Sequence, residues 1–141
     1  MEDCVFCNIV KAESPESLVY SDEKTIALMD IQPVNPGHVL VIPKAHVAGL
    51  TDLDEKTGEH VFKVGMRVAN AIKRSGIKCE GVNLLLSDGR AAFQEIFHVH
   101  LHVIPRFEGD NLRISFGRKY GVRPERTELD AIAAKIRNAL R

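Results

Sequence analysis

Three histidines alternate with aliphatic residues in the second half of the chain, at a spacing that suits them for chemistry. They are His98, His100 and His102, separated by Val99 and Leu101. A period of two is that of a β-strand, so we expect the imidazoles to share one face while the aliphatic side chains enter the core. Alternate side chains on one face lie about 7 Å apart, so a phosphorus atom over His100 could be reached from both sides. This pattern predicts a reactive site.

The chemistry that such a row offers is nucleophilic attack at phosphorus. Neutral imidazole is a good nucleophile near pH 7, and phosphoryl oxygens need hydrogen-bond donors as charge develops on them. Gln94, six residues before His100, is a further uncharged donor candidate. A second interpretation places a catalytic metal ion on the three imidazoles, with one coordination position open. A flat strand holds the rings too nearly in line for this unless it bulges.

A Cys-x-x-Cys pair, Cys4 and Cys7, begins the chain. The spacing allows two thiolates to bind one tetrahedral zinc ion, but supplies only half of its ligands. A redox pair would need a thioredoxin-like step from strand to helix, whereas this pair precedes residues 8–10 near the terminus. Two free structural cysteines are the third interpretation, and the residues alone leave all three open.

The strands that must position these residues follow from alternation and from turn-forming residues. We expect strands at residues 18–21, 25–29, 38–42 and 81–86, and a histidine strand over 98–105. If the third of these strands is pleated in the usual way, its first residue, His38, lies at the start of the strand and next to Gly37. Backbone without a Cβ lets a ligand approach closely there, which suits a nucleoside.

Two helices are also expected. The long one ends at Ser75, with Thr51 or Asp52 as its N-cap and Gly76 just beyond its end. The second begins after a cap at Thr127. Helical spacing predicts one apolar stripe on each, formed by Val61, Val64, Val68, Ala71 and Ile72 on the first and by Leu129, Ile132, Ala133, Ile136 and Leu140 on the second.

Length and composition predict one domain over residues 1–141 that can bury a core without disulfides. Lysine plus arginine and aspartate plus glutamate number 19 each, so no overall field attracts nucleic acid or an anionic membrane, and local groups must hold any anionic ligand. No apolar run approaches the roughly 20 residues of a membrane span, and the acidic start Met1-Glu2-Asp3 is unlike a signal peptide. We therefore expect a cytoplasmic protein whose cysteines are thiols or metal ligands.

The run His98-Val99-His100-Leu101-His102-Val103 resembles the histidine triad motif of the HIT superfamily of nucleotide hydrolases and transferases. The cysteine pair, residues 30–43 and residues 94–106 are similar to the corresponding blocks of its bacterial members, in the same order. The resemblance implies an α+β fold, with an antiparallel sheet of about five strands, one long helix and a C-terminal helix, assembled as a homodimer.

The resemblance also implies a mechanism. His100 would attack the α-phosphate of a nucleotide, either a nucleoside phosphoramidate or a dinucleoside polyphosphate such as a diadenosine polyphosphate. Water would then cleave the nucleotidyl-histidine, while His102 and Gln94 hold phosphate oxygens. The expected partner is a purine nucleotide or dinucleotide. Asp30 matches the position that binds ribose hydroxyls, and His38 lies in the same nucleoside pocket.

The same resemblance implies a structural zinc site. His46 and His98 match a histidine pair that binds zinc together with Cys4 and Cys7 in some bacterial members. In members that lack the cysteines, the two histidines can hydrogen bond without metal. A zinc-stabilised nucleotide-binding module without significant turnover is therefore an alternative to an enzyme.

Three positions depart from the family pattern. Ser87 stands where many members have Asn or Gln near the ribose or phosphates, and we assign it to the nucleotide site. Phe93 stands where Gly commonly precedes the Gln, which leaves open the length of polyphosphate accepted. Glu95 replaces Ser or Thr, and a carboxylate there repels phosphate unless it points away.

Overall fold

The computed structural model describes residues 3–12 and 16–141, so the first two residues of the acidic start lie outside the described part of the chain. The chain divides into two compact units, Met1–Asn111 and Leu112–Arg141. The first unit contains the sheet and every residue predicted to do chemistry. That the chain is one domain stays a prediction.

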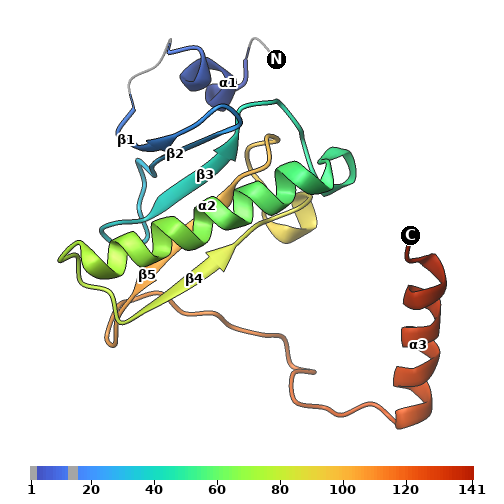
Figure 1. Cartoon of the computed structure of the whole chain (residues 1–141). Helices are drawn as coiled ribbons and strands as arrows, with labels where there is room; N and C mark the ends of the chain where they lie inside the picture. The colour runs from blue at the N-terminus through green and yellow to red at the C-terminus, as the bar shows by residue number, and fades with distance from the viewer. Residues whose placement is uncertain (1–2, 13–15) are drawn as a thin grey trace. The chain divides into compact units, whose positions relative to one another are not determined.

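Five antiparallel strands in the order β1-β2-β3-β5-β4 form the sheet of the first unit (Figure 1). The prediction of an α+β fold with an antiparallel sheet of about five strands is confirmed. β3 and β5 are neighbours, so the strand that follows His38 lies beside the strand that contains His102. The strands are β1 Leu18–Ser21, β2 Thr25–Met29, β3 Val39–Pro43, β4 Gly81–Leu85 and β5 Leu101–Arg106.

Helix α2, Glu55–Arg74, covers one face of the sheet (Figure 1). Gly65 permits the close approach, because a Cβ there would lie 2.7 Å from Cδ2 of Leu101. The predicted stripe was wrong at Ala71, which is exposed, whereas Ala69 is buried. Ala69 lies four residues after Gly65 on the same helix face, whereas Ala71 is turned away from it at about 3.6 residues per turn. The core between α2 and the sheet consists of Ala27, Val39, Val41, Val61, Val64, Val68, Ala69, Ile72, Leu101 and Val103.

The start of α2 differs from the prediction. Its N-cap is Asp54, whose Oδ1 accepts a hydrogen bond of 2.9 Å from the backbone N–H of Thr57. The predicted caps, Thr51 and Asp52, lie in a short 3₁₀ turn, η1 Leu50–Asp52. Asp54 is favoured as the N-cap because its carboxylate also accepts a hydrogen bond from the Thr57 hydroxyl. One side chain thereby satisfies two donors of the first turn.

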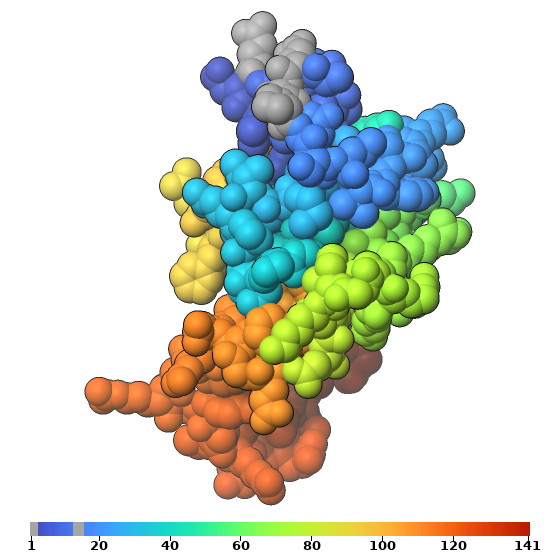
Figure 2. Space-filling model, turned by 90° about the vertical axis from the view of Figure 1, so that its left-hand side faces the viewer, coloured from blue at the N-terminus to red at the C-terminus, as the bar shows by residue number. Residues whose placement is uncertain are grey.

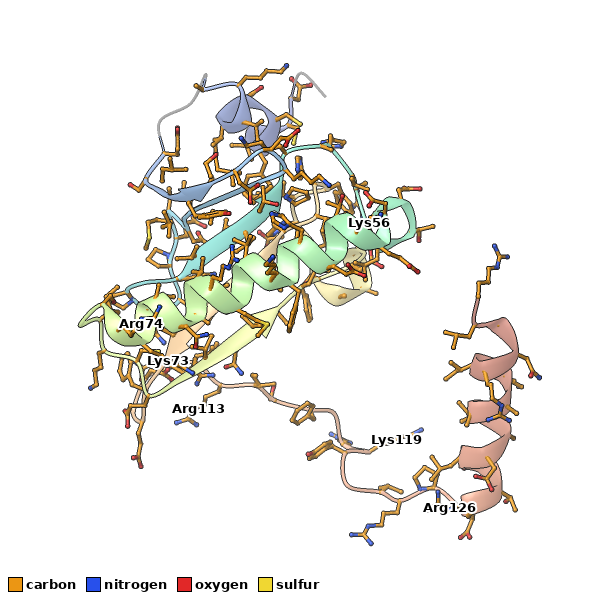
Figure 3. The ribbon with its side chains drawn as sticks, in the orientation of Figure 1. Lys56, Lys73, Arg74, Arg113, Lys119 and Arg126 are labelled. Carbon is orange, nitrogen blue, oxygen red and sulfur yellow. The ribbon has the colours of Figure 1, made fainter. Side chains whose placement is uncertain are left out.

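The end of α2 agrees with the prediction. Ser75 is the C-cap, and Gly76 follows with a φ of +88°, the left-handed conformation that favours glycine. Lys73 and Arg74 lie in the last turn, where positive charge is favourable for the helix dipole (Figure 3).

A short helix that the sequence did not predict, α1 Val5–Val10, packs on the opposite face of the sheet (Figure 1). Phe6 and Ile9 lie one turn apart and both are buried, so the helix places its apolar side against the strands. The core on this face consists of Phe6, Ile9, Ile26, Leu28, Leu40 and Ile42.

The histidine strand is shorter than predicted. β5 begins at Leu101, so His102 is in the strand while His98 precedes it. The chain is diverted before Leu101, where the N–H of Val99 donates to the carbonyl of Val47 at 2.7 Å. The three histidines therefore do not share one continuous strand face, and their side chains can serve different sites.

The second unit contains α3, Arg126–Ala139. Its N-cap is Glu125 and not the predicted Thr127. The predicted apolar stripe is not buried within the chain, because Leu129, Ile132, Ile136 and Leu140 are all exposed. Among the helices of the described residues, none combines the length and the apolar character that crossing a membrane requires.

Candidate active site and metal centre

The backbone orients the ring of His100 and fixes which of its two nitrogens carries a proton. Its Nδ1 lies 2.7 Å from the backbone carbonyl oxygen of His98, and a carbonyl only accepts, so Nδ1 carries the proton. The lone pair of the neutral ring is then on Nε2. The ring is 8% exposed and packs against the edge of Phe6, with 5.1 Å between ring centroids. This arrangement pre-orients a nucleophile.

The tautomer of His102 is set by a chain of hydrogen bonds that begins at the backbone. The N–H of Val34 donates to Nδ1 of His38 at 3.1 Å, so the proton of His38 is on Nε2. That Nε2 lies 2.9 Å from Nδ1 of His102 and donates to it. His102 therefore carries its own proton on Nε2, where it can donate to an anion.

Burial keeps this histidine pair neutral at pH 7. Burial, together with the adjacent His100 and His38, lowers the pKa of His102 to about 4, although Asp30 acts to raise it. Burial also lowers the pKa of His38, against the opposing effect of Asp30. Neutral rings are what the chain of hydrogen bonds requires, since a protonated His102 could not accept from His38.

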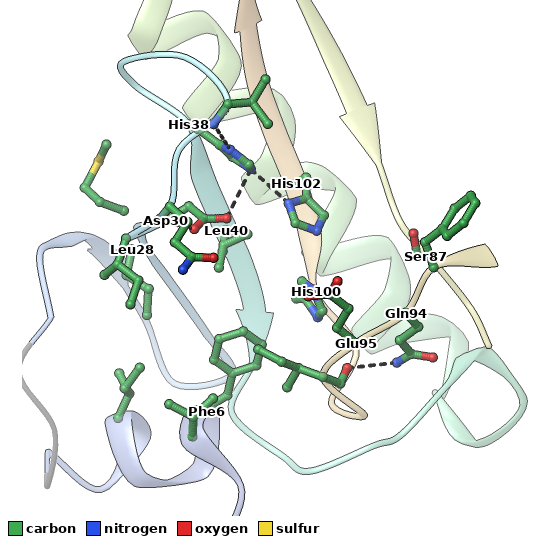
Figure 4. A pocket seen from close by; sticks show the side chains of 18 residues that line it. Phe6, Leu28, Asp30, His38, Leu40, Ser87, Gln94, Glu95, His100 and His102 are labelled. Carbon is green, nitrogen blue, oxygen red and sulfur yellow. Dashed lines mark hydrogen bonds and ion pairs between the residues drawn. The ribbon is translucent and has the colours of Figure 1, made fainter. Parts of the chain in front are cut away.

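A pocket of about 540 Å³ lies over His100 and His102, within the size range of small-molecule sites. The loop before β3, in cyan, and the turn near residue 90, in yellow, contribute to it and lie next to each other in Figure 2. In Figure 4, Asp30 lies on one side of His100 and Ser87 on the other. Apolar side chains of α1, β2 and β3 form the wall on the Asp30 side, including Phe6, Leu28 and Leu40.

Asp30 closes a turn and also lines the pocket. Its Oδ1 accepts from the N–H of Gln32 at 2.8 Å, which closes a local turn. Its Oδ2 lies 3.5 Å from Nε2 of His38, and the carboxylate lines the pocket. Holding the turn therefore fixes the carboxylate next to His38, where a pair of hydroxyls could bind.

Gln94 holds a turn instead of offering a donor to the pocket. The side chain is 5% exposed, and its Oε1 accepts from the N–H of Gly89 at 2.8 Å. Its Nε2 donates to the carbonyls of Ala48 at 2.7 Å and Ile96 at 3.1 Å. Both amide hydrogens are engaged, so in this arrangement Gln94 has none left for a phosphate and is a positioning residue.

The turn that Gln94 holds presents Phe93 in an unusual conformation. Phe93 has a φ of +66°, a left-handed conformation that costs a non-glycine residue on the order of 1 to 3 kcal/mol. Its N–H donates to the carbonyl of Arg90 at 2.9 Å, and its side chain lines the pocket while 87% exposed. Ser87 and Glu95 line the same wall.

His98 turns away from the pocket, toward the cysteines. Its Nδ1 lies 3.5 Å from Sγ of Cys4 and 3.6 Å from Sγ of Cys7, and Sγ of Cys7 lies 3.3 Å from Nδ1 of His46. The four ligand atoms all lie within 4.8 Å of one another. A tetrahedral ion with bonds of about 2.3 Å to sulfur and 2.0 to 2.1 Å to nitrogen separates sulfur from nitrogen by about 3.6 Å. The cluster therefore has the dimensions and the donor atoms of a zinc site.

The surroundings of His98 and Cys7 fit a metal centre better than a redox pair. Nε2 of His98 donates to the carbonyl of Pro43 at 2.8 Å, which leaves the Nδ1 lone pair directed at the sulfur atoms. Burial, reinforced by the adjacent Cys4, raises the pKa of the Cys7 thiol. A reactive cysteine needs a lowered pKa, so the redox interpretation loses support.

The structure thus divides the predicted site residues between two centres. His98 joins the cysteine cluster, and its carbonyl accepts from Nδ1 of His100, whereas His100 and His102 line the pocket. Two groups of side chains among the described residues could hold a metal ion, the cysteine cluster and the group of Asp30, His38 and His102. Neither contains His100, so the three-histidine metal site is not formed. The sequence analysis did not identify Phe6 as a site residue, because α1 was not predicted. It did not identify Val34 because that residue acts through its backbone N–H, which every residue except proline has.

Comparison with known proteins agrees with this geometry. Residues 11–109 match the model of the HIT domain family. A HIT family protein of Bacillus anthracis superposes with a TM-score of 0.91 at 37% identity, covering 99% of both chains. A Zn-bound histidine triad family protein of Mycobacterium smegmatis gives 0.76 at 43% identity over 99% of both chains.

A plant protein whose name states an activity is also similar to this chain. The adenylylsulfatase HINT3 of Arabidopsis thaliana is 36% identical over 140 residues, which cover 99% of this chain and 68% of that protein. The family match and the relatives span most of the chain, including the two histidine centres. The chain belongs to the HIT domain family.

Proposed function

We propose that this protein hydrolyses nucleotides at the α-phosphate through a nucleotidyl-histidine intermediate on His100. The observation that carries the proposal is the hydrogen bond from Nδ1 of His100 to the carbonyl of His98, which leaves the Nε2 lone pair free in a pocket. The name of the Arabidopsis relative, an adenylylsulfatase, supports action on an adenylyl compound.

In the first step, Nε2 of His100 forms a bond to phosphorus as the bond to the leaving group breaks, and a leaving amine takes up a proton from solvent, which the second step returns. The imidazole becomes cationic, and the His98 carbonyl stabilises it by accepting from Nδ1–H. In the second step, a water oxygen attacks phosphorus, the phosphorus–nitrogen bond breaks and water gives up one proton. The Nε2–H of His102 is placed to donate to phosphoryl oxygens in both steps.

The nucleoside occupies the Asp30 side of the pocket in this proposal. The Asp30 carboxylate accepts from ribose hydroxyls, next to His38, and a purine base packs against the apolar wall that includes Leu28 and Leu40. Ser87 lines the opposite wall, near the phosphate. The support is chemical: a carboxylate for hydroxyls, apolar side chains for a base and imidazoles for phosphoryl oxygens.

We also propose that Cys4, Cys7, His46 and His98 bind one structural zinc ion. The ion would tie α1 to the sheet and hold His98, and through it the carbonyl that orients His100. In this proposal the histidine side chains of the pocket carry out the chemistry at phosphorus, and the zinc ion only stabilises the fold.

Homodimer assembly is proposed on the strength of α3. Three of its large apolar side chains are exposed within one chain, among them Ile136, which is 64% exposed. Residues 112–141 contain eight basic and three acidic residues, whereas residues 1–111 contain 11 basic and 16 acidic ones, so a basic segment can approach an acidic body. A cytoplasmic location remains part of the proposal.

The test is to trap the intermediate. Acid quench of the wild type with a nucleoside phosphoramidate labelled at the α-phosphorus should leave an acid-labile, base-stable label on the protein, and His100→Ala should abolish the label and turnover. Loss of a covalent nucleophile removes several orders of magnitude of rate, more than the roughly 10² to 10³ expected for one donor. His100→Ala activity within tenfold of wild type would exclude covalent catalysis. Nucleotide binding without any turnover would favour the binding-module alternative.

A further inference from the structure

We propose that Asn35 and Asp110 are positioning residues that fix the tautomer of His102, and with it the hydrogen that this ring would donate to phosphoryl oxygens. Neither residue lines the pocket. The inference rests on the proposed function, because it concerns how one of the proposed donors is kept in place. It assigns a role to a buried hydrogen-bond network that lies outside both the pocket and the metal centre.

Asp110 is a carboxylate fixed near the end of the first compact unit, and its side chain is 2% exposed. Arg106, the last residue of β5, donates one hydrogen bond to each carboxylate oxygen, at 2.7 and 2.8 Å. The backbone N–H of Phe107 donates to Oδ2 at 3.1 Å. These donors, with Arg106 the strongest, hold the pKa of Asp110 well below its usual range although burial acts to raise it. Paired contacts of this kind fix a carboxylate in position and orientation.

Asn35 connects this carboxylate to the loop that precedes β3. Its Nδ2 donates to Oδ2 of Asp110 and to the carbonyl of Pro105, both at 2.9 Å. Both amide hydrogens are therefore engaged, and the residue is only 8% exposed. The backbone carbonyl of Asn35 accepts from the N–H of His38 at 3.1 Å. Asn35 thus ties the loop to the end of β5 on one side and to His38 on the other.

The backbone next to Asn35 supplies the donor that sets the proton of His38. The N–H of Val34 donates to Nδ1 of His38 at 3.1 Å. His38 in turn donates from Nε2 to Nδ1 of His102 at 2.9 Å (Figure 4). Burial lowers the pKa of His38 and keeps the ring neutral, and a neutral imidazole can carry its one proton on either nitrogen. The position of a single backbone N–H therefore decides which tautomer is present.

Releasing the loop would allow the opposite tautomers. With the proton of His38 on Nδ1, its Nε2 would accept from Nδ1–H of His102, and the lone pair of His102 would then be on Nε2. A lone pair repels a phosphoryl oxygen, so the donor would be lost. Asp30 would keep its place, because its Oδ1 accepts from the N–H of Gln32 and its own N–H donates to the carbonyl of His38 at 3.0 Å. The expected defect is therefore in turnover and not in ribose binding.

The direct test is nitrogen-15 NMR of histidine-labelled protein near pH 7, because the nitrogen shifts distinguish the two neutral tautomers. Wild type should carry the proton on Nε2 of both His38 and His102. Asn35→Ala and Asp110→Ala should each show a mixture of tautomers, or the opposite tautomer, at both rings. His60, whose hydrogen bond to a carboxylate is elsewhere on α2, should keep its wild-type shifts.

Kinetics with adenosine 5′-phosphoramidate test the consequence for turnover. The kcat of Asn35→Ala should fall about tenfold, between the roughly twofold loss for two equally populated tautomers and the roughly 10² to 10³ expected when a donor is lost entirely. KM should stay within about threefold of wild type, because Asp30 keeps its place. Asp110→Ala should have the same effects. Asp110→Asn retains an oxygen that can accept from Asn35, so its kcat should lie within about threefold of wild type.

A matched control separates positioning from a general loss of stability. Asp22 is also a carboxylate with several donors, among them Tyr20 and His60, but it lies between β1 and β2. Asp22→Ala should lower Tm as the Asn35 and Asp110 variants do. It should change neither the tautomer of His102 nor kcat, provided that every protein is assayed well below its Tm.

Three results would overturn the proposal. The first, a wild type with the proton of His102 on Nδ1, requires no variant at all. The second is wild-type tautomers in folded Asn35→Ala and Asp110→Ala, and the third is the same change of tautomer and kcat in Asp22→Ala. Failure of the proposed function is recognised separately, because wild type would then not hydrolyse the phosphoramidate, whereas the nitrogen shifts report the tautomers without any turnover.

Discussion

Replacing one cysteine of the metal cluster should destabilise the protein far more than replacing the cysteine outside it. The third cysteine, Cys79, is partly buried at the edge of the core under α2, and its Sγ lies 3.2 Å from the carbonyl of Gly81, a contact that a serine hydroxyl can also make. Cys4→Ser removes a ligand from a cluster that joins α1 to two histidines on other segments. Cys79→Ser is therefore the matched control.

The expected magnitude follows from linkage. An ion that binds only the folded state stabilises it by about 2.7 kcal/mol at a free concentration 100 times Kd and by about 4.1 kcal/mol at 1,000 times Kd. For a unit of this size, with roughly 4 °C of Tm per kcal/mol, Cys4→Ser should lower Tm by about 10 to 15 °C. Cys79→Ser should change it by only a few degrees, as for other small substitutions.

The assay is thermal unfolding of both variants and wild type, with and without a chelator, together with elemental analysis of protein purified without chelator. Chelation should bring wild type to the Tm of Cys4→Ser and should not move Cys4→Ser further. At temperatures well below Tm, the kcat of Cys4→Ser should be less than tenfold below that of wild type, because the proposed ion positions His98 and takes no part in the chemistry at phosphorus. Protein without bound metal, or equal Tm changes for the two variants, would refute the zinc assignment.

Three further predictions concern single side chains. Asp30→Ala should raise KM for ribonucleotides but have a much smaller effect on 2′,3′-dideoxy substrates, and equal effects in steady-state assays would exclude ribose binding. Although burial acts to raise it, the pKa of Asp22 is held well below its usual range by hydrogen bonds from Tyr20 and His60. A carboxyl whose pKa is lower in the folded state stabilises that state above about pH 4, and this stabilisation is lost as the pH falls further. Between pH 5 and 2, the free energy of unfolding in urea should therefore fall less for Asp22→Asn than for wild type. Thr25→Val should stabilise the protein by about 1 to 2 kcal/mol, because Oγ1 of this buried side chain has no hydrogen-bond partner in the described part of the chain. A lower midpoint in urea would show that the hydroxyl has a partner.

The sequence was sufficient for the sheet, for the long helix and for the residues that carry chemistry. Strands 18–21 and 25–29 were predicted with the bounds that the structure has. Alternation and helical spacing report which positions are buried, and burial dominates the choice between strand and helix in long periodic segments. The resemblance to the HIT motif identified the two cysteines and the two histidines that the structure brings together.

Only the tertiary structure decided how the three histidines divide. Alternation fixes a common face only while the strand continues. β5 begins at Leu101, and His98 and His100 precede it, in a segment whose Val99 N–H donates to the carbonyl of Val47. The tautomers of His100 and His102 depend on a carbonyl at His98 and on the N–H of Val34. Backbone groups are present at nearly every residue, so they leave no sequence signal, and their effect depends on where long-range packing brings them.

The same reason explains Gln94 and Phe93. A glutamine in sequence is equally a donor to a ligand and a brace for a turn, and only the positions of the Gly89 N–H and the Ala48 carbonyl show that it braces the turn. A phenylalanine in sequence predicts burial, yet Phe93 is exposed because the turn held by Gln94 imposes a positive φ on it. The sequence therefore determined which side chains are available for chemistry. Packing between distant segments determined which of them line the pocket, which form the metal-capable cluster and which only hold the others in place.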